Sequence, residues 1–193
     1  MIGPWVRHEQ QRLQSNTGKM PVLRSRVARR QSQRAAMTNQ IHSRVTFCPG
    51  LADDTPAILA LENSCFDDEH ERFNSRQVRR LIASAGAVVM VARAGGRIVG
   101  WAAGLARRHA TCSSGRIYAL AVDGESRGMQ IGRRLMEQII GRLRSRGAGR
   151  LYLEVRSDNH AAIALYRKLG FVDFRFLPDY YRPGLHALRM LLK

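Results

Sequence analysis

Residues 151–171 read Leu151-Tyr152-Leu153-Glu154-Val155-Arg156-Ser157-Asp158-Asn159-His160-Ala161-Ala162-Ile163-Ala164-Leu165-Tyr166-Arg167-Lys168-Leu169-Gly170-Phe171. The first residues of this stretch predict a buried strand that ends in a carboxylate, Glu154. The polar residues that follow can cap a short helix, which carries Tyr166 on its apolar side and stops at Gly170. The stretch therefore predicts a strand, a turn and a helix, with an acid at the strand end and a phenol on the helix.

A second unit of strand, turn and helix lies just upstream. The strand 116–122 leads into the turn Arg127-Gly128-Met129-Gln130-Ile131-Gly132, at the head of a long amphipathic helix. The first N–H groups of a helix have no partner within the helix, and with the helix dipole they form a cradle for phosphate. Arg127 adds a charge-assisted contact, and the two glycines let phosphates approach the backbone. The turn predicts a diphosphate site, although its spacing alone also fits a plain strand-to-helix connection.

The remaining pattern from residue 42 onward is typical of a mixed α/β domain, which we expect to cover residues 42–193. Its helices are indicated by apolar residues at helical spacing, and its strands by short apolar runs between turn residues. The expected elements are a strand at 45–48, helices capped by Asp53 or Asp54 and by Ser75, a hairpin of strands 87–92 and 98–103 around Gly95-Gly96, a helix ending at Gly147, and closing strands at 172–177 and 187–192.

Residues 1–41 differ from the rest in composition. They hold eight basic side chains against one acid, a charge of +7, so the other 152 residues carry +10 of the net +17. Their few apolar residues cannot offset the entropy lost on ordering, which predicts a basic, disordered extension. Such an arm could bind ribosome or RNA, or serve as a transit-like presequence. Only three of the 32 basic residues are Lys, so genome composition also explains the arginine excess.

Several classes of protein are excluded by what the sequence lacks. No run approaches the ~18 apolar residues that a membrane helix needs, and the N-terminus lacks the apolar run of a secretory signal. Cys48, Cys65 and Cys112 are odd in number and far apart, which argues against disulfides and predicts a reducing cytoplasm. The six histidines are scattered and no metal site is expected. The motifs of nucleotide-binding P-loops, dinucleotide folds, serine hydrolases and zinc proteases are absent.

The order of these features suits acyl transfer to an amine. That reaction needs a base for the ammonium, donors for the oxyanion, and an acid for the leaving group. Glu154 is a candidate base, Tyr166 a candidate acid, and the backbone N–H groups of Leu120-Ala121-Val122 are candidate oxyanion donors. Each feature also has a structural interpretation: Glu154 as half of a surface ion pair with Arg156, Tyr166 as a core aromatic, and Asn159 as a helix cap.

The two motifs together resemble those of the GNAT superfamily of N-acetyltransferases. The block Leu-Glu-Val-Arg…Asn-x-x-Ala-Ile-x-Leu-Tyr-x-x-x-Gly-Phe is similar to that of the RimI-type protein N-terminal acetyltransferases, and the resemblance covers roughly residues 44–193. It implies a mostly antiparallel central sheet flanked by helices, with splayed central strands. It also implies transfer of the acetyl group of acetyl-CoA to a primary amine, in that group the N-terminal alanine of a small-subunit ribosomal protein.

The resemblance implies roles for individual residues. Glu154 is the proton acceptor, Tyr166 the proton donor, and Asn159 a contact to the cofactor. Gln130 departs from the family pattern Arg/Gln-x-x-Gly-x-Gly/Ala, in which Gly is expected; we expect it to stay helical, to point outward and to reduce CoA affinity modestly. The acetyl-CoA-binding positions are Leu120, Ala121, Val122, Arg127, Gly128, Met129, Gln130, Ile131, Gly132 and Arg133. The ending Asp179-Tyr180-Tyr181, with Ala187 and Met190, also echoes the RimI type.

Two alternatives remain open from the sequence. The acceptor could be a small-molecule amine such as a polyamine, an amino acid or an aminoglycoside. The acidic stretch 67–71, expected to be a loop, has two interpretations: it attracts a cationic acceptor, or it is a solvated loop. From another class, the chain could be a weakly catalytic, basic ribosome- or RNA-associated module on the same scaffold, because fold does not guarantee function.

Overall fold

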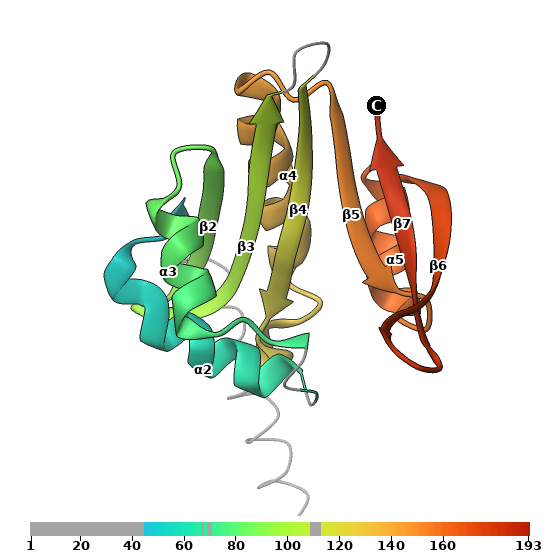
Figure 1. The fold of residues 1–193 in the computed structure, drawn as a ribbon. Coiled ribbons are helices and arrows are strands. Elements are labelled where there is room, and N and C mark those ends of the chain that lie inside the picture. Colours follow the sequence, from blue (N-terminus) through green and yellow to red (C-terminus); the bar gives the residue numbers. More distant parts are fainter. Residues whose placement is uncertain (1–44, 67, 69–70, 109–112) are drawn as a thin grey trace, which may run out of the picture. The chain divides into compact units, whose positions relative to one another are not determined.

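The computed structural model describes residues 45–193 except 67, 69–70 and 109–112 (Figure 1). The predicted basic extension, residues 1–41, lies outside the described residues. The proposed boundary between residues 41 and 42 therefore stays a prediction.

The described residues form a seven-stranded sheet in the order β1-β2-β3-β4-β5-β7-β6. All neighbouring strands are antiparallel except β4 and β5, which are parallel. The expected mixed, mostly antiparallel fold is thus confirmed. The strands are β1 Thr46–Pro49, β2 Ala87–Ala94, β3 Arg97–Arg108, β4 Ser113–Val122, β5 Arg150–Arg156, β6 Val172–Arg182 and β7 Leu185–Leu192.

Helices cover both faces of the sheet. Helices α2 and α3 pack on one face, against β2, β3 and β4, while α4 and α5 lie behind the sheet in Figure 1. None of these described helices is long and apolar enough to cross a bilayer. The helices are α2 Thr55–Cys65, α3 Ser75–Ala83, α4 Ile131–Ser145 and α5 His160–Lys168, with short 3-10 turns η1 Ala52–Asp54 and η3 Gly124–Ser126.

The longest helix, α4, follows the apolar stripe in its sequence. Five of the six stripe positions are buried and Ile140 is half-buried. Gly147, just past the helix end, has φ 88°, a conformation that glycine adopts without the steric cost of a side chain. Periodicity and terminal glycine both gave the right result for α4. The buried positions are Ile131, Leu135, Met136, Ile139 and Leu143.

The start of α2 agrees with the predicted cap in position, and that of α3 does not. Asp54 is the N-cap residue of α2, but its side chain makes no cap hydrogen bond to that helix; it accepts from the Leu51 N–H at 2.9 Å and from Arg93 at 2.6 Å. The cap of α3 is Asn74, not Ser75. The side-chain oxygen of Asn74 accepts from the Gln77 N–H at 2.9 Å, and the Gln77 side chain accepts from the Asn74 N–H at 2.8 Å. This reciprocal pair satisfies two backbone donors, which Ser75 as the first helical residue does not.

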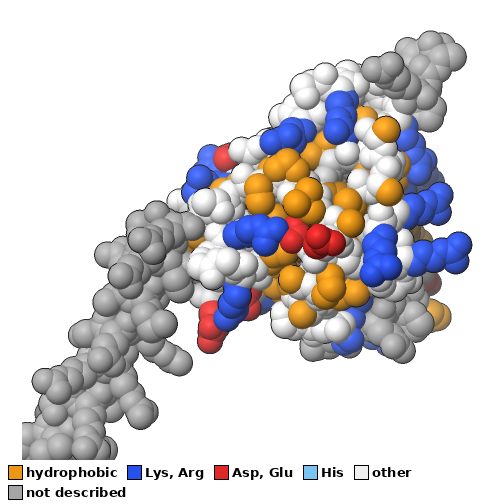
Figure 2. Space-filling view, turned by 90° about the vertical axis from the view of Figure 1, so that its left-hand side faces the viewer, with side chains coloured by type: hydrophobic (Ala, Val, Ile, Leu, Met, Phe, Trp, Pro, Cys, Tyr) orange, Lys and Arg blue, Asp and Glu red, His pale blue; other side chains and the backbone are white. Residues whose placement is uncertain are grey.

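Basic side chains are spread over the surface of the domain. Figure 2 shows the side that lies to the left in Figure 1, where Lys and Arg side chains are more widespread than Asp and Glu. This distribution agrees with the net charge of +10 that the residues after position 41 carry. Such a surface favours association with anionic partners.

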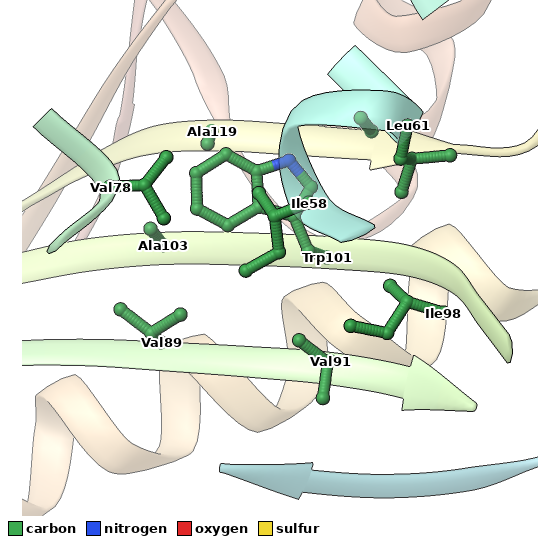
Figure 3. Close-up of a cluster of buried hydrophobic side chains, with 10 residues drawn as sticks. Ile58, Leu61, Val78, Val89, Val91, Ile98, Trp101, Ala103 and Ala119 are labelled. Carbon is green, nitrogen blue, oxygen red and sulfur yellow. The ribbon is translucent and has the colours of Figure 1, made fainter. Parts of the chain in front are cut away.

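The core between α2 and the sheet is centred on Trp101 of β3, which is fully buried (Figure 3). A buried carboxylate, Glu62 of α2, accepts hydrogen bonds from the Trp101 indole N–H at 2.7 Å and from the Phe73 backbone N–H at 3.0 Å. Burial raises the pKa of Glu62, and these two donors act against that rise. The other buried members of the hydrophobic cluster that contains Trp101 are Ile58, Leu61, Val78, Val89, Val91, Ile98, Ala103, Ala119 and Ala121.

We predict that Trp101→Phe lowers the free energy of unfolding by about 1–3 kcal/mol at pH 8, because one buried carboxylate oxygen loses its donor. Without that donor the folded-state pKa of Glu62 rises further. A raised folded-state pKa stabilises the fold at low pH, and this contribution is lost as pH rises through that pKa. The deficit should therefore shrink toward pH 5. Urea denaturation at both pH values measures it, and a deficit equal at both would contradict the role of Glu62.

Candidate active site

The parallel strands β4 and β5 pair over only part of their length. Pairing covers Ser114–Ile117 and Arg150–Leu153, after which the two strands diverge (Figure 1). Beyond that point β4 still pairs with β3 as far as Val122, and β5 still pairs with β7 as far as Arg156. An unpaired strand edge presents alternate N–H and C=O groups to whatever enters the gap. The predicted donor segment Leu120-Ala121-Val122 lies on this free edge of β4.

Glu154 is the first residue of β5 past the last pair, and its side chain is only 6% exposed. One carboxylate oxygen accepts from Arg116 Nε at 2.8 Å and lies 2.7 Å from Arg116 Nη2. The other oxygen accepts from Arg189 Nε at 2.7 Å. These cations stabilise the charged carboxylate and offset the cost of its burial. The interpretation of Glu154 as a partner of Arg156 is wrong, because Glu154 pairs with Arg116 and Arg189, while Arg156 pairs with Glu71 at 2.8 Å and with Asp158 at 2.7 Å.

Tyr166 of α5 is buried, and its ring packs edge-on against Phe171 with centroids 6.0 Å apart. Burial raises the pKa of Tyr166, so the phenol keeps its proton well above neutral pH. Within the described part of the chain, no protein group forms a hydrogen bond with the Tyr166 hydroxyl. Every fully buried polar side-chain atom in that part has a hydrogen-bond partner. The hydroxyl is therefore not fully buried, and it has no hydrogen-bond partner among the described residues.

Tyr181, near the end of β6, lies within electrostatic range of both candidate catalytic residues. It interacts electrostatically with Tyr166 and also with Glu154. Burial, with Glu71 as the next contributor, raises the pKa of Tyr181 to about 12. Glu154 and Tyr166 themselves come from different elements, a strand and a helix on the rear face of the sheet.

The predicted phosphate turn lies at the head of α4, which begins at Ile131. No side chain caps this helix, so its first N–H groups are available to an anion. Arg127 and Arg133 are exposed beside it. A Cβ on Gly132 would lie 3.5 Å from Val122 and 3.6 Å from Leu165, so the helix head packs between the end of β4 and α5. The predicted turn and the free edge of β4 are therefore adjacent.

Gln130 does not stay helical, contrary to prediction. It is the N-cap of α4 in the left-handed conformation, with φ 58° and ψ 12°, and its side chain is exposed. Gly128 is also left-handed, with φ 79°. The turn needs positive φ at both positions to lead into the helix, which gives a physical reason for glycine in the family pattern. Gln130 adopts this backbone at a steric cost.

Asn159 lies at the N-terminus of α5. Its side-chain oxygen accepts a hydrogen bond from the Ala162 N–H at 3.1 Å, so it caps the helix. Its side chain is exposed. The structural interpretation of Asn159 is thus correct, and its contact with a cofactor stays a prediction.

Sequence reasoning missed the two arginines that hold Glu154. Arg189 is a charged residue within the predicted strand 187–192, and Arg116 begins the predicted strand 116–122, so a charge in or beside each apolar run was the available signal. Their convergence depends on register: Arg116 pairs with Tyr152 of β5, and Arg189 pairs with Glu154. Residues two apart on a strand share a face, so all of these side chains meet.

Comparisons with known proteins agree with this geometry. Residues 55–171 match the acetyltransferase (GNAT) family. N-alpha-acetyltransferase RimI of Mycobacterium tuberculosis (strain H37Rv) is 41% identical over 92 residues, covering 47% of this chain and 56% of that protein. The [ribosomal protein bS18]-alanine N-acetyltransferase of Escherichia coli (strain K12) is 43% identical over 65 residues, covering 34% of this chain and 44% of that protein.

The solved structure of the ribosomal-protein-S18-alanine N-acetyltransferase from Escherichia coli superposes with a TM-score of 0.66 at 25% identity, covering 77% of this chain and 93% of that one. The chain belongs to the acetyltransferase (GNAT) family. The sequence matches span about half the length of the two named relatives.

We predict that Gln130→Gly raises the free energy of unfolding by about 1 kcal/mol, because it relieves the left-handed conformation. Arg127→Gly is the matched control in the same turn. Arg127 has φ −66°, so glycine there only adds freedom to the unfolded chain and should lower stability by about 0.4–1 kcal/mol. Urea denaturation measures the free energy of unfolding of both variants. An equal decrease of this free energy in the two variants would rule out the left-handed turn.

Proposed function

We propose that this protein is an acetyl-CoA-dependent N-acetyltransferase that modifies the α-amine of a protein N-terminus, as its named relatives do. The observation that carries the proposal is the separation of β4 and β5 immediately before Glu154, beside an uncapped helix head. The basic extension lies outside the described residues, and its association with ribosome or RNA stays a prediction, as does a cytoplasmic location.

The residues present fit acetyl-CoA. The N–H groups at the head of α4, from Ile131 to Arg133, would hold its diphosphate, with Arg127 as an additional cation. The free edge of β4 at Leu120–Val122 would hydrogen-bond the acyl carbonyl and stabilise negative charge on its oxygen. When bound, acetyl-CoA supplies an acetyl group activated as a thioester.

Glu154 suits the role of proton acceptor. A carboxylate has about four lone-pair positions, and the three short contacts to Arg116 and Arg189 leave room for one more donor. That position can take a proton from the acceptor ammonium, directly or through water. An α-amine, with a pKa of ~8, gives up its proton more readily than a lysine at ~10.4, which favours an N-terminus as acceptor.

Tyr166 suits the role of proton donor. Its phenol stays protonated because burial raises its pKa, and its hydroxyl makes no hydrogen bond to another described residue. It can donate to the sulfur as the thiolate leaves. Two protons therefore move: one passes from the amine to Glu154, and another passes from Tyr166 to the leaving thiolate. Release of the first to solvent and uptake of a proton by the Tyr166 phenolate restore both residues.

We predict that Glu154→Gln lowers the acetylation rate by roughly 10²-fold or more, most strongly at low pH, where more of the amine is protonated. The measurement is thiol release from acetyl-CoA with a peptide that begins with alanine, between pH 6.5 and 9.5, with an N-terminally blocked peptide as blank. Acetyl-CoA binding, measured by calorimetry, should be retained.

The matched control for this change is Asp173→Asn, the same carboxyl-to-amide exchange in an exposed ion pair with Arg167. It should leave the rate unchanged, because exposed pairs contribute little. Since Glu154→Gln leaves two arginines without their anion, its unfolding must also be measured. A folded Glu154→Gln protein with full activity at every pH would place the base elsewhere.

We predict that Tyr166→Phe lowers kcat by roughly 10²-fold while the KM for acetyl-CoA changes little. The substitution removes no hydrogen bond within the described residues, so Tm should stay the same within about 2 °C. Steady-state kinetics and thermal unfolding test both statements together. An unchanged kcat would reduce Tyr166 to a packing residue.

A further inference from the structure

A cavity of about 310 Å³ opens beside Glu154 on the same face of the sheet. Its walls include three arginines and two aromatic rings. Tyr152 and Phe174 pack against each other with centroids 5.7 Å apart and form an apolar wall. The charged side chains that line the cavity are Arg107, Arg116, Arg189 and Glu154.

Strand register explains why residues so far apart in sequence converge here. Arg107 of β3 lies opposite Ser114 of β4, which is two residues before Arg116 on the same face. Across β5, Glu154 lies opposite Arg189 of β7. The cavity is therefore built from β3, β4, β5 and β7, with Phe174 of β6 at its wall.

Positive charge in the cavity exceeds what Glu154 requires. Three guanidinium groups face one carboxylate, a net charge of 3 − 1 = +2. One arginine would neutralise Glu154, and the sequence supplies two that touch it and a third, Arg107, that does not. Arg107 donates instead to the Tyr118 hydroxyl at 3.1 Å.

Many guanidinium donors in the cavity are also unused by the protein. A guanidinium has five N–H donors. Among the described residues, Arg189 uses only Nε, on Glu154, and its terminal nitrogens have no protein acceptor. A planar fork of donors of this kind matches a carboxylate, which it can bind through two parallel hydrogen bonds.

We propose that this cavity binds a carboxylate that the acceptor carries close to its reacting amine, so that the protein prefers N-termini with an acidic residue directly after the first. This inference rests on the proposed function, because Glu154 marks where the amine reacts. The cavity borders Glu154. Its excess positive charge would select the acid of the second residue, and the aromatic wall would contact the side-chain methylene groups of that residue.

The test compares amidated peptides that begin Ala-Glu and Ala-Gln and are otherwise identical. The wild-type protein should show a kcat/KM about tenfold higher for the Glu peptide, mainly through a lower KM, since hydrogen bonds to a charged group have this magnitude. Arg107→Gln should remove most of that preference, because Arg107 lines the cavity without touching Glu154. Arg79→Gln removes an equal charge from the exposed side of α3 and should keep the preference.

A second pair of acceptors, free alanine and alaninamide, distinguishes the source of the carboxylate. Preference for Ala-Glu over Ala-Gln assigns the cavity to an acidic side chain in a protein N-terminus. Preference for alanine over alaninamide, with no difference between the peptides, supports a carboxylate cavity but assigns it to a free amino acid. Equal rates within both pairs, with the peptides still acetylated, would overturn this inference and leave the proposed function standing. Acetylation of none of the four acceptors would overturn both.

Discussion

The chemistry of this domain depends on two parallel strands that stop pairing with each other while each keeps its other partner. After Ile117 and Leu153, β4 stays joined to β3 and β5 to β7, so the sheet continues as two halves. Backbone groups on the facing edges need hydrogen-bond partners, and in a packed domain such groups rarely go without. A ligand with amide and carbonyl groups can supply them. The same separation places Glu154 at the opening, because it is the first residue beyond the last pair.

Two buried carboxylates on the α2 side of the sheet are held by different kinds of donor. This difference distinguishes a structural carboxylate from a candidate catalytic one. Glu62 accepts from an indole N–H and a backbone N–H, and these contacts fix α2 on the sheet. Glu154 is held by two guanidinium groups from strands on either side. Glu62 has neutral donors and lies in a closed core, where a substrate cannot reach it. At the open strand edge, Glu154 keeps one lone-pair position that its two guanidinium partners do not occupy.

Local sequence patterns were sufficient to predict the helices and strands. The convergence of the site residues could not be predicted from local patterns. The turn Gly95-Gly96 and the stripe of α4 are short-range patterns, and the structure has both. The cap of α3 was misassigned because Asn74 and Ser75 are both good caps, and only the reciprocal bond with Gln77 decides between them. The arginines around Glu154 were missed because their meeting depends on strand order and register. Both are set by the whole sheet rather than by any window of sequence.

Gln130 shows which part of the structure determines the anion-binding turn. A residue with a side chain occupies a left-handed position that favours glycine, and yet the turn leads into α4 in the usual way. Since residue 130 opposes this conformation, its neighbours must impose it. Gly132 brings the helix head against Val122 and Leu165, and Ile131 is buried directly after the turn. Packing of α4 against β4 and α5 therefore fixes the direction of the free N–H groups. The strain at Gln130 is the local consequence of that packing, as is common where a functional site over-determines its backbone.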